Sequence, residues 1–192
     1  RYVCAGCGCG FGPTKVAGAP EALLSADYGL LYEDYSEGDG TRTERRAFDL
    51  LGHPRGMPVL NWGCGAWSRC IDELRAEGHD AWGYEPSATN ASPFVVSQRG
   101  SISPVFGGVF SNNVIEHMVR PVEEFRYLHS ILRPGSRMAH ASPCHEWLYD
   151  VSRYHVFFPL GDSPRVLAER SGFRAVDRFK DGEFIAWIYE RV

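Results

Sequence analysis

The stretch VLNWGCGAWSRCIDELRAEGHDAWGYEPS, from Val59 to Ser87, decides the fold of this chain. It begins with a short apolar strand, turns at closely spaced glycines and continues as a helix with one apolar face. A second short strand, Ala81–Tyr84, follows and ends at an acidic residue. This order of elements is half of a nucleotide-binding α/β unit, so the stretch predicts parallel strands and a nucleotide-containing ligand.

Two features of the stretch indicate how that ligand is held. Gly63-Cys64-Gly65 allow the backbone to approach a ligand closely. Glu85 ends the second strand, where a carboxylate can accept hydrogen bonds from ribose hydroxyls. The fingerprint of NAD-binding proteins, Gly-x-Gly-x-x-Gly or Ala, fails at its last position, which is Ser68. The motif therefore favours another adenosine-containing cofactor, and an NAD(P)-dependent oxidoreductase is the weaker alternative.

The composition limits the classes of partner. The chain has 192 residues, 44% of them hydrophobic, which suits one globular domain with a small appendage. Its formal net charge of -4 gives no electrostatic reason to expect a nucleic acid or an anionic membrane. No apolar run approaches the roughly 20 residues that a membrane span needs. Six cysteines without the pattern of a disulfide framework favour a reducing compartment, so we expect a cytoplasmic protein.

Helices and strands alternate on both sides of the opening stretch. Thr41 with Glu44 predicts a capping box at the start of a helix that ends near Leu51. Pro121 predicts the first turn of a later helix, and Asp181-Gly182 predicts a turn between two C-terminal strands. No strand is predicted between residues 86 and 105. The other predicted elements are strands at 105–112, 138–142, 173–179 and 183–192 and a helix from 163 to 171.

Four stretches, in this order, resemble the motifs of the class I S-adenosylmethionine-dependent methyltransferases, within a group that has a small Cys-rich N-terminal piece. They are VLNWGCGAWS (59–68), GYEPS (83–87), the run with NNVIEH (109–143) and the run from RYHVFF to GFRAV (153–176). The resemblance implies an α/β, Rossmann-like fold with a mostly parallel seven-stranded sheet, helices on both faces and an antiparallel C-terminal hairpin. Residues 1–40 would then form a Cys-rich segment and residues 41–192 the methyltransferase domain.

The resemblance implies S-adenosylmethionine as the cofactor. Its contacts would come from the glycine turn, the acidic residue and polar residues after a later strand: Asn61, Gly63, Cys64, Gly65, Glu85, Pro86, Asn112 and Asn113. Asn61 stands where the family usually has Asp or Glu, and Trp67 (or Ala66, depending on the alignment) replaces the third glycine of the motif. Because of these two departures, a catalytically degenerate methyltransferase-like binding module is an alternative to an active enzyme.

Histidines are the candidate catalytic residues. Methyl transfer from a sulfonium requires mainly positioning, and a base helps only where the acceptor must lose a proton. His117 is a candidate for that base, and its alternative role is that of a satisfied surface histidine. His145 and His155 are further candidates, on segments expected to cover the cleft. The resemblance implies a small-molecule acceptor, such as a sugar or another natural-product intermediate.

Cys4 and Cys7 have the spacing of metal ligands, and Cys9 follows. A closed zinc site needs four ligands. The group named above often has two Cys pairs in its N-terminal piece, and Cys4 and Cys7 would match the second pair. The resemblance thus implies zinc at Cys4 and Cys7, and a loop with reduced thiols is the alternative.

Overall fold

The computed structural model describes most of the chain. The described residues are 1–13, 16, 19, 20, 23, 26, 30, 38–52, 56–65, 68–88, 92–102, 105–149 and 154–192. Trp67 and the acidic, tyrosine-containing segment 31–37 lie outside them, so the expected effect of Trp67 on the cofactor motif stays a prediction. No helix among the described residues is both long enough and apolar enough to cross a membrane.

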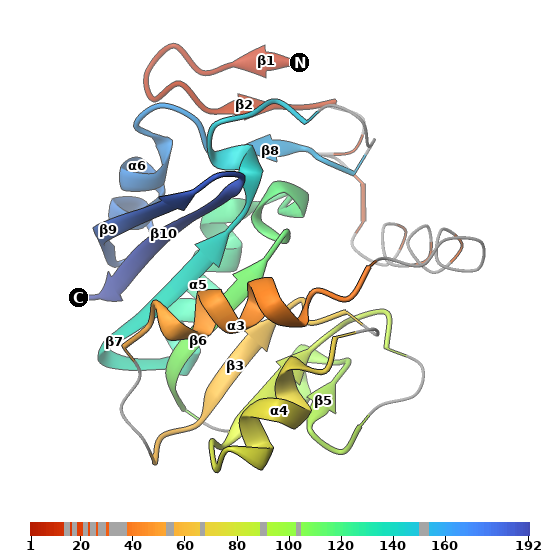
Figure 1. The fold of residues 1–192 in the computed structure, drawn as a ribbon. Coiled ribbons are helices and arrows are strands. Elements are labelled where there is room, and N and C mark those ends of the chain that lie inside the picture. Colours follow the sequence, from red (N-terminus) through yellow and green to blue (C-terminus); the bar gives the residue numbers. More distant parts are fainter. Residues whose placement is uncertain are drawn as a thin grey trace.

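A mixed sheet with the strand order β5-β4-β3-β6-β7-β10-β9 forms the centre of the described structure (Figure 1). The first five strands in this order are parallel, and β10 pairs antiparallel with both β7 and β9. The predicted Rossmann-like fold with a C-terminal antiparallel hairpin is confirmed. The strands are β3 (Val59–Trp62), β4 (Ala81–Tyr84), β5 (Val95–Val96), β6 (Phe106–Asn112), β7 (Leu132–Ala141), β9 (Phe173–Asp181) and β10 (Phe184–Arg191).

Helices cover both faces of this sheet. Alternate residues of a strand point to opposite faces, so neighbouring residues of β3 pack against different helices. Val59 packs in one apolar cluster with residues of α3 (Thr41–Asp49) and α4 (Cys70–Ala76). Its neighbour Leu60 packs in a second cluster with residues of α5 (Pro121–Ile131) and α6 (Ser163–Arg170). Figure 1 shows α3 and α4 in front of the sheet and α5 behind it. The inner strands are therefore buried on both faces, as β3 shows at all four of its residues.

A second, three-stranded sheet joins the N-terminus to a late segment of the chain. β1 (Tyr2–Val3) pairs with β2 (Gly10–Phe11), which pairs with β8 (Phe157–Phe158), all antiparallel. These two-residue strands have no periodicity that a sequence could reveal. Three short 3-10 helices complete the described elements: η1 (Arg99–Ser101), η2 (Ile115–His117) and η3 (Pro143–His145).

The predicted capping box is wrong. Gly40 is the N-cap of α3, and the carboxylate of Asp39 accepts hydrogen bonds from the backbone N–H and the hydroxyl of Thr41. The side chain of Glu44 is therefore not needed at the helix end and points into the core. The helix itself, with Ala47 and Phe48 buried, is as predicted.

Two strands also differ from the prediction. β7 begins at Leu132 instead of at residue 138, because Pro134-Gly135 interrupt the pairing with β6 without ending the strand. The register shifts there, and Gly135 has a φ of 75°. β5, which was not predicted, has only two residues. Such a strand is too short to show an alternating pattern.

Candidate active site

The predicted ligand residues meet at one edge of the sheet. β3 is parallel to β4 on one side and to β6 on the other, so the carboxyl ends of all three strands lie together (Figure 1). From β3 the chain builds outward through β4 to β5 and then returns to the other side of β3 as β6. This reversal is the topological switch point at which open α/β sheets bind their ligands.

The glycine turn after β3 packs against the segment that follows β6. The backbone N–H groups of Gly63 and Cys64 both donate to the carbonyl oxygen of Tyr84, at 2.8 and 3.1 Å. Gly63 has a φ of 73°, and a Cβ at this position would lie 2.7 Å from Cγ2 of Val114. Gly65 has a φ of 62°, but a Cβ there would meet no atom within 4 Å. The turn is therefore closed toward Val114 and open at Gly65.

Glu85 lies beside this open position, partly exposed. Its Oε2 accepts a hydrogen bond from the backbone N–H of Gly65 at 3.0 Å. Its Oε1 accepts from the N–H and the hydroxyl of Ser87, at 3.0 and 2.6 Å. A carboxylate oxygen can accept two hydrogen bonds, so Oε2 retains capacity for a ribose hydroxyl. Pro86 is exposed next to it.

A buried carboxylate from another element stands beside Asn61. The Nδ2 of Asn61 and the hydroxyl of Ser68 both donate to Oε2 of Glu44, each at 2.6 Å. Burial raises the pKa of Glu44 to about 7, although these two hydrogen bonds oppose the shift. The Oδ1 of Asn61 is buried and has no hydrogen-bond partner among the described residues. Glu44 of α3 thus supplies the acidic group that the motif lacks at Asn61. The sequence pattern around Thr41 does not reveal this arrangement.

Asn112 and Asn113 follow the same edge on the other side of β3. Asn112 is the last residue of β6 and is partly buried. Asn113 has a φ of 56°, is exposed, and donates its backbone N–H to the carbonyl of Ala141 at 2.8 Å. Val114, the residue that would collide with a Cβ at Gly63, comes next. Both asparagines therefore lie close to the glycine turn.

His117 and His155 come together from segments far apart in the sequence. Their ring centroids are 4.9 Å apart and nearly perpendicular. Nδ1 of His117 lies 3.2 Å from the carbonyl oxygen of Tyr154, and Nδ1 of His155 lies 2.7 Å from that of Tyr149. Burial, and then the neighbouring His155, lower the pKa of His117 to about 3. The ring of His117 is therefore neutral at physiological pH.

His145 lies in a different environment. It is buried in η3, and its Nε2 lies 3.0 Å from the carbonyl oxygen of His140. Burial lowers its pKa to about 4. The structure thus brings two of the three candidate histidines together and places His145 outside that pair.

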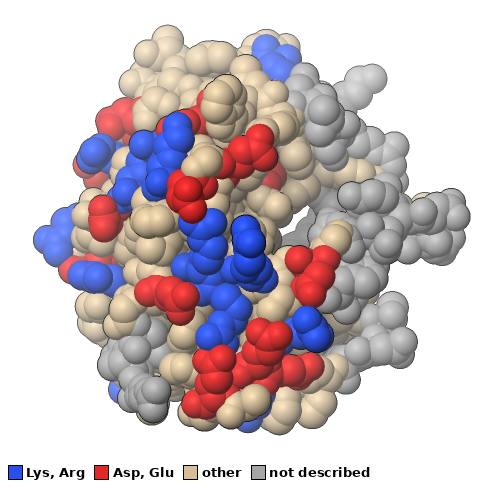
Figure 2. Space-filling view, viewed as in Figure 1, with Lys and Arg blue, Asp and Glu red and all other residues tan. Residues whose placement is uncertain are grey.

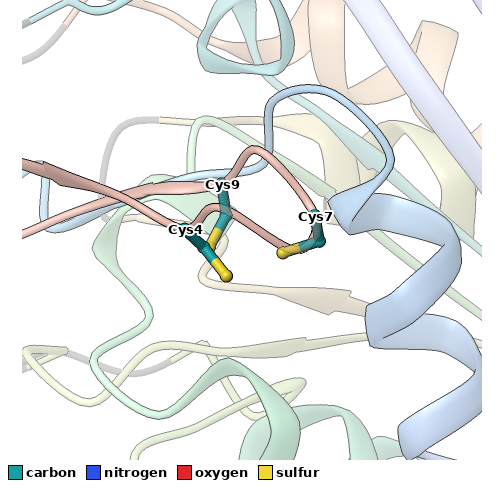
Figure 3. A group of neighbouring side chains, drawn as sticks. All are labelled: Cys4, Cys7 and Cys9. Carbon is teal, nitrogen blue, oxygen red and sulfur yellow. The ribbon is translucent and has the colours of Figure 1, made fainter.

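The N-terminal cysteines gather in the turn between β1 and β2. The Sγ atoms of Cys4, Cys7 and Cys9 all lie within 4.8 Å of one another, and Figure 3 shows the three side chains directed toward a common point. Burial, followed by the neighbouring Cys7 and Cys4, raises the pKa of Cys9 to about 12. A metal ion would remove this cost, because it binds the thiolate form. The sequence spacing predicts Cys4 and Cys7 as ligands, and the structure places Cys9 beside them.

Comparisons with known proteins agree with the fold. The family described as "Methyltransferase domain" matches residues 40–178. A curated tRNA U34 carboxymethyltransferase from Idiomarina loihiensis is 29% identical over 102 residues, which are 43% of this chain and 32% of that protein. The chain thus spans about a third of that relative's length.

Solved structures show the same fold at low identity. An S-adenosylmethionine-dependent methyltransferase from Listeria monocytogenes has a TM-score of 0.56 at 14% identity, over 78% of this chain and 98% of that one. The magnesium protoporphyrin IX methyltransferase of Synechocystis PCC 6803, solved with bound SAH, also has a TM-score of 0.56 at 14% identity. It covers 93% of this chain and 92% of that one.

Proposed function

We propose, from the premise that the chain belongs to the methyltransferase-domain family, that it transfers a methyl group from S-adenosylmethionine to a small-molecule acceptor. One observation supports this most strongly. The glycine turn, Glu85 and Asn112 lie at the adjacent carboxyl ends of parallel β3, β4 and β6, at the switch point of the sheet.

The residues at this edge fit the cofactor. We assign Glu85 to a ribose hydroxyl through Oε2 and the glycine turn Gly63–Gly65, which is open at Gly65, to the amino acid part. Cys64, Pro86, Asn112 and Asn113 complete the lining. Near Asn61, Glu44 supplies a carboxyl group, and an ammonium group placed beside it would favour its ionised form. When bound, the cofactor supplies a methyl group already activated on a sulfonium, so the chain needs no nucleophile of its own.

We propose that the methyl acceptor binds beside His117 and His155, and we call this part of the site the acceptor side. An imidazole nitrogen can accept the proton of an acceptor hydroxyl, and His117 and His155 are the candidates for this role. Because burial lowers the pKa of His117 to about 3, His117 is a weak base. His145 is the third candidate; because it is buried against the carbonyl of His140, we expect its effect to come through positioning. A sugar or another natural-product intermediate is the acceptor class that we propose.

The Cys-rich segment at residues 1–40 is proposed to accompany the methyltransferase domain at 41–192 and to bind zinc. Cys4 and Cys7 are the predicted ligands, and the position of Cys9 supports a third. All six cysteines are free, which supports a cytoplasmic protein.

A thermal-shift experiment tests the cofactor. We expect S-adenosylmethionine (SAM) and its demethylated product S-adenosylhomocysteine (SAH), but not NAD, to raise the melting temperature. A ligand at 100 times its Kd adds about 2.7 kcal/mol, or roughly 5–10 °C for a chain of this size. Glu85→Gln should lose most of the shift, whereas the exposed control Glu169→Gln should keep it. No shift with any ligand, or an unchanged shift in Glu85→Gln, would contradict the assignment.

A second experiment tests the acceptor class. SAH release is measured with a panel of sugar and phenol acceptors and with transcribed tRNA, because one relative is a tRNA-modifying enzyme. The net charge of -4, and the interleaved acidic and basic side chains on the face shown in Figure 2, support turnover with small molecules and none with tRNA. Turnover with tRNA alone would overturn the proposed acceptor. SAH binding without turnover on any acceptor would favour the binding module.

A further inference from the structure

A carboxylate joins the two histidines on the acceptor side. Glu116, His117 and His155 each place a potential ligand atom within 4.8 Å of the others. Glu116 is 1% exposed, whereas His117 and His155 are partly exposed as residues. The carboxylate thus lies inside the protein, and the two histidines are less deeply buried than it is.

The backbone holds the three residues in place. The N–H of Val156 donates to the carbonyl of Glu116 at 2.8 Å, which fastens the segment before β8 to η2. The carbonyls of Tyr154 and Tyr149 accept from Nδ1 of His117 and His155, respectively. A carbonyl at Nδ1 fixes the neutral tautomer with its lone pair on Nε2. Histidines that bind metals usually have such a partner on their other nitrogen.

We propose that Glu116, His117 and His155 bind a divalent transition-metal ion through one carboxylate oxygen and two imidazole nitrogens. Two histidines and one carboxylate, with positions left for water or substrate, form a ligand set typical of Zn²⁺ and Fe²⁺. Mg²⁺ and Ca²⁺ prefer oxygen ligands. The site is separate from the three thiols in the turn between β1 and β2.

The position of this site gives the ion a role, which rests on the proposed methyl transfer. Val114 lies between the glycine turn and η2, so the ion lies near the acceptor side of the cofactor site. A bound metal lowers the pKa of an oxygen ligand. With the ion bound, the two imidazoles are its ligands and no longer serve as the base, and an acceptor hydroxyl on the ion would lose its proton to solvent. Its oxygen lone pair would then form the new C–O bond while the S–C bond breaks and its electron pair stays on sulfur, giving SAH.

Metal titrations test the site independently of catalysis. Untagged Cys4→Ser/Cys7→Ser protein, which lacks two of the three clustered thiols, is freed of metal with EDTA, dialysed and titrated with Zn²⁺ by calorimetry. We expect one bound ion. His155→Ala in the same background should weaken Zn²⁺ binding at least about 100-fold, more than the loss of an outer hydrogen-bond partner does. Glu116→Gln should also weaken it, and Co²⁺ should show a ligand-field spectrum without thiolate charge-transfer bands.

Other results of these titrations would contradict the proposed metal site or the proposed class of metal. Failure of Zn²⁺ to bind, or an unchanged affinity in both variants, overturns the site. Binding of Mg²⁺ in preference to Zn²⁺ overturns the assigned class of metal. His155 is partly exposed, so its variant should fold, and circular dichroism checks this. SAH binding, measured on the same samples, separates the two proposals: SAH binding without Zn²⁺ binding removes only the metal site, and the reverse removes only the cofactor assignment.

Discussion

At the residue scale, Glu44 is the most informative side chain. A carboxylate in the core is costly unless it is paired or protonated. Glu44 has hydrogen bonds from Asn61 and Ser68 but no ion pair with a cationic side chain among the described residues. Its pKa of about 7 lies above the ordinary value of 4.5, so the folded state takes up a proton more readily than the unfolded chain does.

This shift predicts a pH dependence of stability. The contribution of Glu44 is fully present below its unfolded pKa, near pH 4.5, and is lost as the pH rises through about 7. The loss is on the order of 3 kcal/mol, since one pKa unit is about 1.4 kcal/mol. Glu44→Gln should flatten this dependence in urea unfolding at pH 5 and pH 8. If wild type and variant lose the same stability between these pH values, Glu44 is not the responsible group.

Restoring the family's usual acidic residue at Asn61 is predicted to destabilise the protein. Asn61→Asp restores the usual acidic residue, but it replaces an N–H donor 2.6 Å from Glu44 by a second carboxylate. We expect it to lower the free energy of unfolding at pH 8 by about 1–3 kcal/mol. The double variant Glu44→Gln/Asn61→Asp should recover most of this loss, because the amide donor returns on the other residue. Additive effects in this double-mutant cycle would show that the two side chains do not interact.

At the element scale, the turn between β3 and α4 carries two glycines with different constraints. Gly63→Ala should cost about 1–2 kcal/mol for its left-handed backbone and about 1–3 kcal/mol more for crowding against Val114. Gly65→Ala should have only the backbone cost, because no atom lies within 4 Å of the added Cβ. Chemical denaturation of both variants measures the difference. Equal losses would mean that Val114 does not close the turn.

The same elements show what a sequence can reveal. The stretch from Val59 to Ser87 predicts its strands and helix well, because apolar periodicity and glycine turns are local signals. The contact of Glu44 with Asn61 could not be predicted, since it depends on how α3 packs against β3. The pairing of His117 with His155 likewise depends on a backbone hydrogen bond between distant segments. Local pattern thus predicts the candidate cofactor residues, whereas the proximity of the two candidate histidines required the tertiary structure.

At the scale of the whole molecule, the small sheet β1-β2-β8 attaches the N-terminus to the segment that carries His155. The N–H of Gly12 donates to the carbonyl of Val156 at 2.9 Å, next to that histidine. The turn that presents Cys4, Cys7 and Cys9 therefore belongs to the same sheet as β8, the strand that follows His155. A metal in this turn would stabilise strands whose side chains Tyr2, Val3 and Phe11 are exposed.

Chelation should therefore act on this region first. With metal bound, the N-terminal residues should resist limited proteolysis, and EDTA should open cleavage around Gly6 and Gly8 while the central sheet stays intact. Cys4→Ser/Cys7→Ser protein should be cleaved there with or without EDTA. Mass spectrometry of the fragments measures this. If the wild type is cleaved at the same rate with and without chelator, the N-terminal turn does not bind a metal ion.

The most direct test of the central claim is a crystal structure of the chain with bound SAH. We expect a ribose hydroxyl within hydrogen-bond distance of Glu85 and the amino acid part against Gly63–Gly65. The sulfur should face the side of Asn112 and His117. SAH bound elsewhere, or bound without contact to Glu85 and the glycine turn, would contradict the assignment of the carboxyl ends of β3, β4 and β6 as the methyl-transfer site.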